Sequence, residues 1–251
     1  MSDTNEDFTQ ISGFTPADAS ISKEHGLAYW ESVSADENGM LGGIPTVAGF
    51  ANTSKIDLQG SRNFLAKFGI GSKPGLRRCK RILEGGAGVG RITEGLLTEL
   101  LVEENEEGVG GPGKVDVVEP IAKFTAKLQG KKGVGKVYVM GLEEWVPEYK
   151  YDLVWTQWCV GHLTDEQLVA YLQRCKSALA EDGLIVIKEN TTVLGHDDFD
   201  KEDSSVTRGE ATFQKVFQKA GLKVVKAEFQ KGFPQTRTMK LLPVRMYALK
   251  P

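Results

Sequence analysis

The chain has 251 residues, 40% of them hydrophobic, which is enough for one domain with a substantial core. Its net charge of -3 argues against binding nucleic acid through the phosphates. Its three cysteines include no CxxC pair, so neither a disulfide framework nor a metal site is expected. The N-terminus, MSDTNEDFTQ, resembles neither a signal nor a transit peptide, and no stretch is apolar enough to span a membrane, so we expect a cytoplasmic or nuclear protein that acts away from membranes.

The first part of the chain predicts a helical extension. Residues 1–20 are polar and are expected to form a flexible segment. A helix over 22–33 begins at a serine suited to an N-cap, and a second helical pattern covers 57–68. A glycine-rich loop at 39–43 separates the two. We expect these pieces, residues 21–72, to form helices and a lid that precede the core.

From residue 79 to 251, short apolar runs alternate with helical patterns. Strands are predicted at 81–83, 115–118, 136–139, 151–156, 183–188, 223–229 and 244–249. Helices are predicted at 92–102, 121–128, 164–180 and 208–220. This alternation is typical of a parallel sheet covered on both faces, whereas the last two strands lack a helix between them and should pair antiparallel. The expected fold is therefore α/β: one domain over 21–251, with a seven-stranded, mostly parallel sheet and an antiparallel last strand.

Three local signals complete this pattern. Thr164-Asp165-Glu166-Gln167 reads as a capping box, with the threonine at the cap and the glutamine reaching back to it. Gly221 follows the last predicted helix and is a candidate C-cap. The stretch 103–113 is charged and rich in glycine, and is interpreted as a solvated loop.

Four glycines lie in the segment LEGGAGVGRIT, residues 83–93, between the first core strand and a helix. A dinucleotide fingerprint would need glycine where Arg91 stands, and no Gly-Lys-Ser/Thr follows as in a Walker loop. What remains is an acid followed by alternating glycines, Glu84-x-Gly86-x-Gly88-x-Gly90. Glu119 ends the second strand, where an acid can accept both hydroxyls of a ribose. The combination predicts a nucleoside ligand; the alternative is a tight strand-to-helix turn that binds nothing.

These features resemble the class I S-adenosylmethionine-dependent methyltransferases, from residue 79 to the C-terminus. The resemblance implies a Rossmann-like fold and S-adenosyl-L-methionine as cofactor, with the turn at Gly86 under its methionine part and Arg91 meeting the methionine carboxylate. The Asn/Asp-Pro-Pro-aromatic tetrapeptide of many DNA and glutamine methylases is missing after the fourth strand. Trp158-Cys159-Val160-Gly161-His162 stands there instead.

An ordered set of six motifs is similar to one family, the protein N-terminal methyltransferases, which act on the α-amine of proteins beginning X-Pro-Lys after Met removal. The motifs are Tyr29-Trp30, 39–43, Gln157-Trp158, 161–165, Lys188-Glu189-Asn190 and 203–206. Glu84 and Glu119 depart from the aspartates common in the family. Residues 231–243 match poorly, and nothing is carried over to them.

The family resemblance implies roles for individual residues. The cofactor contacts would be Gly86, Arg91, Glu119, Leu142, Glu143 and Gln157. The peptide contacts would be Trp158 against the proline ring, Asn190 at the peptide backbone near the amine, Leu41 and Gly42 as a lid over the N-terminal residue, and Asp200, Asp203 and Ser205 around the lysine. The candidate general bases are His162 and Asp203.

The chemistry suits these residue types, because methyl transfer needs a neutral amine as nucleophile. An α-amine has a pKa of about 7.7–8.0, so freeing it at pH 7 costs about 1 kcal/mol, against about 4–5 kcal/mol for a lysine side chain. A carboxylate or an imidazole is therefore an adequate base. The acidic stretch 196–203 would pair with a cationic peptide.

We therefore expect a monomeric enzyme that adds up to three methyl groups to X-Pro-Lys termini, ribosomal proteins among them, without nucleic acid or membrane partners. Two alternatives stay open. A small-molecule amine methyltransferase on the same fold would not distinguish Pro-Lys from other second and third residues. A non-catalytic cofactor-binding module would bind such N-termini tightly and form no product.

Overall fold

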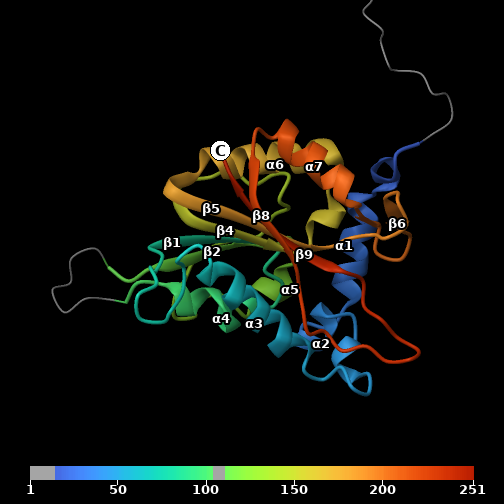
Figure 1. Ribbon diagram of the computed structural model, residues 1–251, viewed down its shortest axis with the longest axis horizontal. Helices are drawn as coiled ribbons and strands as arrows, with labels where there is room; N and C mark the ends of the chain where they lie inside the picture. Colours follow the sequence, from blue (N-terminus) through green and yellow to red (C-terminus); the bar gives the residue numbers. More distant parts are fainter. Residues whose placement is uncertain (1–14, 104–110) are drawn as a thin grey trace, which may run out of the picture.

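Seven strands form one sheet in the order β3-β2-β1-β4-β5-β9-β8 (Figure 1). The structure, a computed structural model, describes residues 15–103 and 111–251. Its strands are β1 Arg81–Gly85, β2 Lys114–Val118, β3 Val134–Tyr138, β4 Tyr151–Gln157, β5 Leu179–Asn190, β8 Lys223–Phe229 and β9 Val244–Lys250. β9 runs antiparallel to both of its neighbours, and the β3-β2-β1-β4-β5 pairs are parallel. The predicted α/β class, with an antiparallel last strand, is confirmed.

Helices cover both faces of the sheet (Figure 1). The α-helices are α1 Lys23–Ser32, α2 Glu37–Met40, α3 Thr53–Ala66, α4 Arg91–Gly95, α5 Ala122–Thr125, α6 Asp165–Ser177 and α7 Glu210–Lys219. The 3-10 helices are η1 Ala17–Ser20, η2 Ile44–Thr46, η3 Leu97–Leu100 and η4 Val160–His162. One buried cluster joins α6 and α7 to the sheet through residues such as Leu172, Phe213 and Tyr247. A second cluster, with Phe64 and Trp155, joins α3 to the opposite face.

Local sequence signals fix the ends of two helices as predicted. Thr164 Oγ1 accepts a hydrogen bond from the Gln167 amide, and Gln167 Oε1 accepts one from the Thr164 amide, at 3.2 and 2.9 Å. Gly221 follows α7 with a φ of +69°, a conformation that glycine adopts without steric cost. Both helices therefore start or stop where the chain itself satisfies the free backbone groups.

Other helix boundaries differ from the prediction. The helix predicted over 92–102 ends at Gly95, because glycine is a poor helix former and Leu96 leaves the helical region at a φ of -140° before η3 begins. The helix expected over 121–128 is limited to α5. α3 begins at Thr53, four residues before the predicted start.

Two segments gain structure that was not predicted. η1 lies within the segment predicted to be flexible, and Asp18 there accepts a hydrogen bond from the Asp165 amide at 2.8 Å. The acidic stretch contains a hairpin of β6 Asp198–Asp200 and β7 Ser205–Thr207. The Ser22 amide donates to Ser204 Oγ at 2.8 Å, and α1 and β6 lie side by side in Figure 1. Residues 1–14 of the flexible segment and 104–110 of the predicted loop lie outside the described residues.

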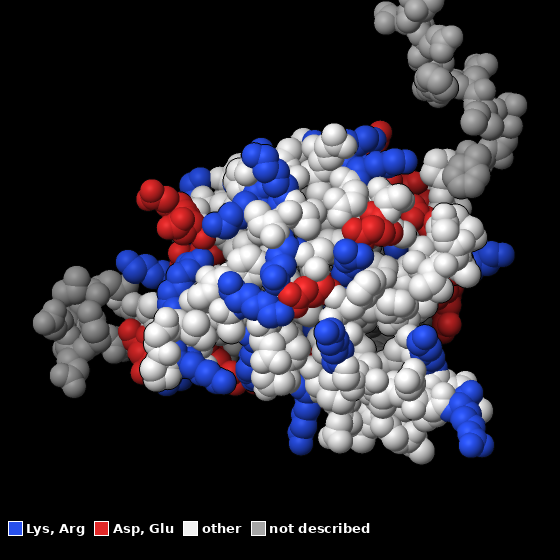
Figure 2. All heavy atoms as spheres, in the orientation of Figure 1, with Lys and Arg blue, Asp and Glu red and all other residues white. Residues whose placement is uncertain are grey.

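Cationic and acidic side chains are interspersed with uncharged surface on the face drawn in Figure 2. Among the helices of the described chain, none is both long and apolar enough to cross a bilayer. Neither observation points to a functional site. Most of the residues predicted to bind the cofactor lie instead at one edge of the sheet.

Candidate active site

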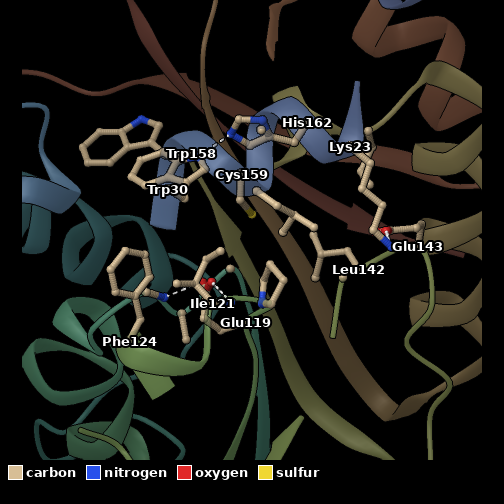
Figure 3. A pocket seen from close by; sticks show the side chains of 18 of the residues that line it. Lys23, Trp30, Glu119, Ile121, Phe124, Leu142, Glu143, Trp158, Cys159 and His162 are labelled. Carbon is tan, nitrogen blue, oxygen red and sulfur yellow. Dashed lines mark hydrogen bonds and ion pairs between the residues drawn. The ribbon is translucent and has the colours of Figure 1, made fainter. Parts of the chain in front are cut away.

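A cavity of about 280 Å³ opens beside the carboxyl ends of β1, β2 and β4. Ligand sites of parallel α/β sheets form at this edge, where strands end and loops diverge. In Figure 3 the side chains of Trp30 and His162 lie on one side of this cavity, and those of Glu119 and Phe124 on the other. The wall therefore combines apolar rings with a few polar groups from different segments of the chain.

The glycine turn forms the floor between β1 and α4. Gly86 has a φ of +70°, and a Cβ at this position would collide with Cys159 Sγ. The amides of Gly88 and Ile121 each donate to one carboxylate oxygen of Glu119, both at 2.9 Å. Burial raises the pKa of Glu119, and these two hydrogen bonds oppose that rise. Glu119 thus holds the turn in place, and each of its oxygens keeps a lone pair that can accept from a ligand.

Arg91 and Gln157 both line the cavity, and both contact a residue behind it. Arg91 Nη1 lies 2.8 Å from Oδ2 of Asp57, and Gln157 Nε2 donates to both oxygens of the same carboxylate. Asp57 belongs to α3 and has no solvent exposure. Sequence reasoning missed it, although it is the one acid of α3, a helix whose buried side faces the sheet.

Trp158 follows β4 in a conformation rare for a residue with a side chain, with a φ of +54°. The Trp158 amide donates to the Lys188 carbonyl, and Glu189 Oε1 accepts from the amides of Cys159 and Val160 at 2.7 and 3.0 Å. Such backbone strain costs about 1–3 kcal/mol and persists where the surroundings hold it. The Trp158 indole is thereby fixed at the cavity wall, with the Arg91 guanidinium 5.2 Å from its ring centroid.

His162 lies at the junction between the cavity and the acidic hairpin. Trp30 Nε1 donates to its Nε2 at 2.9 Å, and Oδ2 of Asp203 is 3.9 Å from the same nitrogen. Burial lowers the pKa of His162, although the nearby Asp203 carboxylate opposes this effect. Asp203 is itself held, because its Oδ1 accepts from the Ser205 amide at 3.1 Å.

The structure brings together eight of the residues predicted to form the site. They all line the one cavity: Gly86, Arg91, Glu119, Leu142, Glu143, Gln157, Trp158 and His162. The other predicted residues lie outside its lining. These are Leu41, which is buried, Gly42, which is exposed, Asn190 at the end of β5, and Asp200, Asp203 and Ser205 in or beside the β6–β7 hairpin. Asp203 adjoins the cavity beside His162, with its Oδ2 3.9 Å from Nε2 of that histidine.

Lys23 is a further lining residue that the sequence did not reveal. It extends from α1 to Glu143 and Glu144, with Nζ 2.6 and 2.5 Å from their carboxylates, as the pair with Glu143 in Figure 3 illustrates. The two carboxylates raise the pKa of Lys23. Its side chain is half exposed, so the ion pairs themselves contribute little stability. They show instead that α1, which also lines the cavity through Gly26 and Trp30, contacts the segment that follows β3.

Comparisons with known proteins all find similarity to methyltransferases. The family described as AdoMet dependent proline di-methyltransferase matches residues 18–250. Alpha N-terminal protein methyltransferase 1 of Schizosaccharomyces pombe is 41% identical over 230 residues, which cover 90% of this chain and 94% of that protein. N-terminal Xaa-Pro-Lys N-methyltransferase 1-B of Xenopus laevis is 40% identical over 210 residues, covering 82% and 86%. A SAM-dependent methyltransferase from Leishmania major has a similar structure, with a TM-score of 0.74, 35% identity, and coverage of 90% of this chain and 82% of that one.

Proposed function

Because the chain belongs to the family of AdoMet-dependent proline di-methyltransferases and is an S-adenosylmethionine-dependent protein N-terminal methyltransferase, we propose that its substrates are proteins whose mature N-terminus reads X-Pro-Lys. The observation that carries this proposal is the position of Trp158 and His162 in the same cavity as the glycine turn. The β6–β7 hairpin, which holds Asp203, adjoins this cavity. Oδ2 of Asp203 lies 3.9 Å from Nε2 of His162.

The residues of the cavity fit the cofactor. Gly86 brings bare backbone to the cavity at a point where a Cβ would collide with Cys159, Arg91 suits a carboxylate, and Glu119 suits the two hydroxyls of a ribose. Leu142, Glu143 and Gln157 complete this side, with Leu142 as an apolar contact for the adenine. When bound, S-adenosylmethionine supplies an electrophilic methyl group on a sulfonium.

The peptide would lie on the other side of the cavity. Trp158 offers a rigid aromatic face to the proline ring, and Asn190 offers an amide to the peptide backbone. Leu41 and Gly42 would cover the first residue. Asp200, Asp203 and Ser205 would surround the lysine at position three, because a desolvated ammonium group needs carboxylate and hydroxyl partners.

The amine must lose a proton before it attacks. Asp203 and His162 are the candidate bases, and we favour Asp203 because Nε2 of His162 already accepts a hydrogen bond from Trp30. The proton would pass from the α-ammonium nitrogen to the Asp203 carboxylate, while neutral His162 fills the space beside it without adding charge. Orientation of the amine toward the methyl group would supply the larger part of the rate enhancement.

Peptides beginning Ser-Pro-Lys test this proposal directly. Incubation with cofactor should add one to three methyl groups, located at the α-amine by tandem mass spectrometry. An N-acetylated peptide is the first control and should stay unmodified. Ser-Pro-Gln and Ser-Ala-Lys peptides are the second and third, and should react about tenfold more slowly, which corresponds to a loss of about 1.4 kcal/mol for each missing contact. Equal rates for all three free peptides would instead support a general amine methyltransferase.

The remaining expectations follow from the same proposal. We infer that ribosomal proteins are among the substrates, that the enzyme acts as a monomer, and that it works in the cytoplasm or nucleus, a reducing setting that suits its three free cysteines. Intact-mass analysis of ribosomal proteins from cells with and without the enzyme tests the first inference. Light scattering of the purified protein tests the second.

A further inference from the structure

Asp57 is the centre of a buried polar cluster behind the cofactor cavity. Its carboxylate contacts three side chains, each from a different element: Arg91 at 2.8 Å, Gln157 at 3.0 Å and Lys188 at 2.6 Å. Asp57 and Lys188 have no solvent exposure, and the Arg91 side chain is only 7% exposed. The Asp57 carboxylate therefore has two cationic partners, Arg91 and Lys188, and no exposure to solvent.

The cluster divides into residues that reach the cavity and residues that do not. Arg91 and Gln157 line the cavity, whereas Asp57 and Lys188 lie outside its lining. Asp57 therefore touches the cavity only through the two side chains that it binds. Within the described chain, the hydrogen bonds of the Arg91 guanidinium all come from Nη1, so its other N–H groups remain for a ligand.

The cluster contains one carboxylate and two cationic side chains. The ammonium of Lys188 and the guanidinium of Arg91 lower the pKa of Asp57 against the opposing effect of burial, and the carboxylate stays ionised. One anion and two cations leave a net positive charge next to the glycine turn. Lys188 is held further by Ser61 Oγ at 2.9 Å and Gln230 Oε1 at 2.8 Å, so its position is independent of any ligand.

We propose that Asp57 is a positioning residue for the cofactor: it fixes the orientation of Arg91 and Gln157, while Lys188 neutralises it from behind. This inference rests on the cofactor contacts proposed above for those two residues. It assigns the N-terminal helix α3 a part in cofactor binding, since the residue that aligns the site comes from outside the strand-and-turn core. The cofactor carboxylate would take the positive charge that the cluster leaves unbalanced.

The first test is Asp57→Asn, which keeps the size of the side chain and removes its charge. We expect affinity for S-adenosylhomocysteine, measured by calorimetry without peptide, to fall about tenfold or more, because a misaligned arginine loses bidentate contact. The KM for peptide should stay within about twofold. Asp116→Asn is the matched control: Asp116 is equally buried and pairs with Arg81 at 2.7 Å, but it lies outside the cavity lining. It should lower stability and leave cofactor affinity unchanged.

A second variant covers the case in which Asp57→Asn does not fold. The double variant Asp57→Asn, Lys188→Met removes one charge of each sign and keeps the net charge of the cluster. It should fold and still bind cofactor about tenfold more weakly. Wild-type cofactor affinity in the folded double variant overturns the proposal.

A thermodynamic cycle with Arg91→Lys separates positioning from a general structural role. If Asp57 acts through Arg91, Asp57→Asn should cost much less cofactor affinity in the Arg91→Lys background than in the wild type. Equal losses in both backgrounds contradict the proposal. The measurements of cofactor affinity use no peptide, so a failure of X-Pro-Lys methylation would refute the proposed substrate without affecting the conclusion on Asp57.

Discussion

The indole N–H of Trp30 donates a hydrogen bond to Nε2 of His162 across 2.9 Å. Because Nε2 is the acceptor, this contact assigns the imidazole proton to Nδ1, which is buried and has no partner among the described residues. Burial lowers the pKa of His162, so the ring is uncharged at neutral pH. The contact thus joins helix α1 to the candidate catalytic edge, and it favours Asp203 over His162 as the candidate base.

Substituting each candidate base in turn shows which of them contributes more to kcat. Asp203→Asn should lower kcat about 100-fold or more, since general base catalysis contributes on that order, whereas His162→Gln should lower it about tenfold. Single-turnover assays at saturating cofactor measure both. Asp198→Asn, in the same hairpin but exposed, is the control and should keep kcat within about twofold. A larger loss in His162→Gln than in Asp203→Asn would assign the base to the histidine.

The indole of Trp158 should matter for the peptide and not for the cofactor. Trp158→Leu keeps an apolar side chain and removes the flat ring, so the KM for a Ser-Pro-Lys peptide should rise about tenfold. Cofactor affinity should change by less than about threefold, the margin allowed for the contact with Arg91. A Ser-Ala-Lys peptide should lose little in this variant; equal losses for both peptides would mean that the indole does not recognise proline.

The capping box of α6 gives a prediction on stability alone. Thr164→Ala removes the acceptor for the Gln167 amide and should lower the free energy of unfolding by about 1 kcal/mol. Urea denaturation measures the change. Thr238→Ala, on the exposed surface, should change it by less than about 0.5 kcal/mol. If the two variants are equally stable, the box contributes nothing to the fold.

Glu189 gives a prediction on pH. Burial raises its pKa from 4.5 to about 7, so the folded protein binds more protons than the unfolded chain between these values, and stability falls as pH rises through this window. Glu189→Gln keeps an oxygen for the amides of Cys159 and Val160 but does not titrate. The stability of the wild type relative to this variant should therefore fall by about 2–3 kcal/mol from pH 5 to pH 8. If the difference in stability between wild type and variant does not change with pH, Glu189 is not a buried carboxyl that titrates in this range.

Much of the architecture follows from short-range sequence patterns. The strands are apolar runs bounded by turns, and the capping box lies within four consecutive residues, 164–167. The glycine turn is equally local, because each positive φ belongs to one residue. Such features could be predicted because the atoms that stabilise them are close together in the chain.

Features that depend on distant partners could not be predicted. Asp57 and Lys188 are separated by 131 residues, and nothing near Asp57 in the sequence indicates a buried lysine as its partner. The contact between Trp30 and His162 spans 132 residues and was likewise missed. The break after Gly95 was missed for a different reason: the apolar pattern of 92–102 fits a helix and outweighed the poor helix propensity of Gly95, after which Leu96 leaves the helical region.

The position of β9 in the sheet determines when β8 can pair during folding. It lies between β5 and β8, and it is the last element of the chain. β8 therefore has no strand to pair with until residues 244–250 have left the ribosome, and a nascent chain that stops before them exposes the unpaired edges of both β5 and β8. During synthesis, the sheet beside the candidate active site thus stays open to wrong pairing until β9 has been made, and chaperones that shield exposed strand edges would act at this stage.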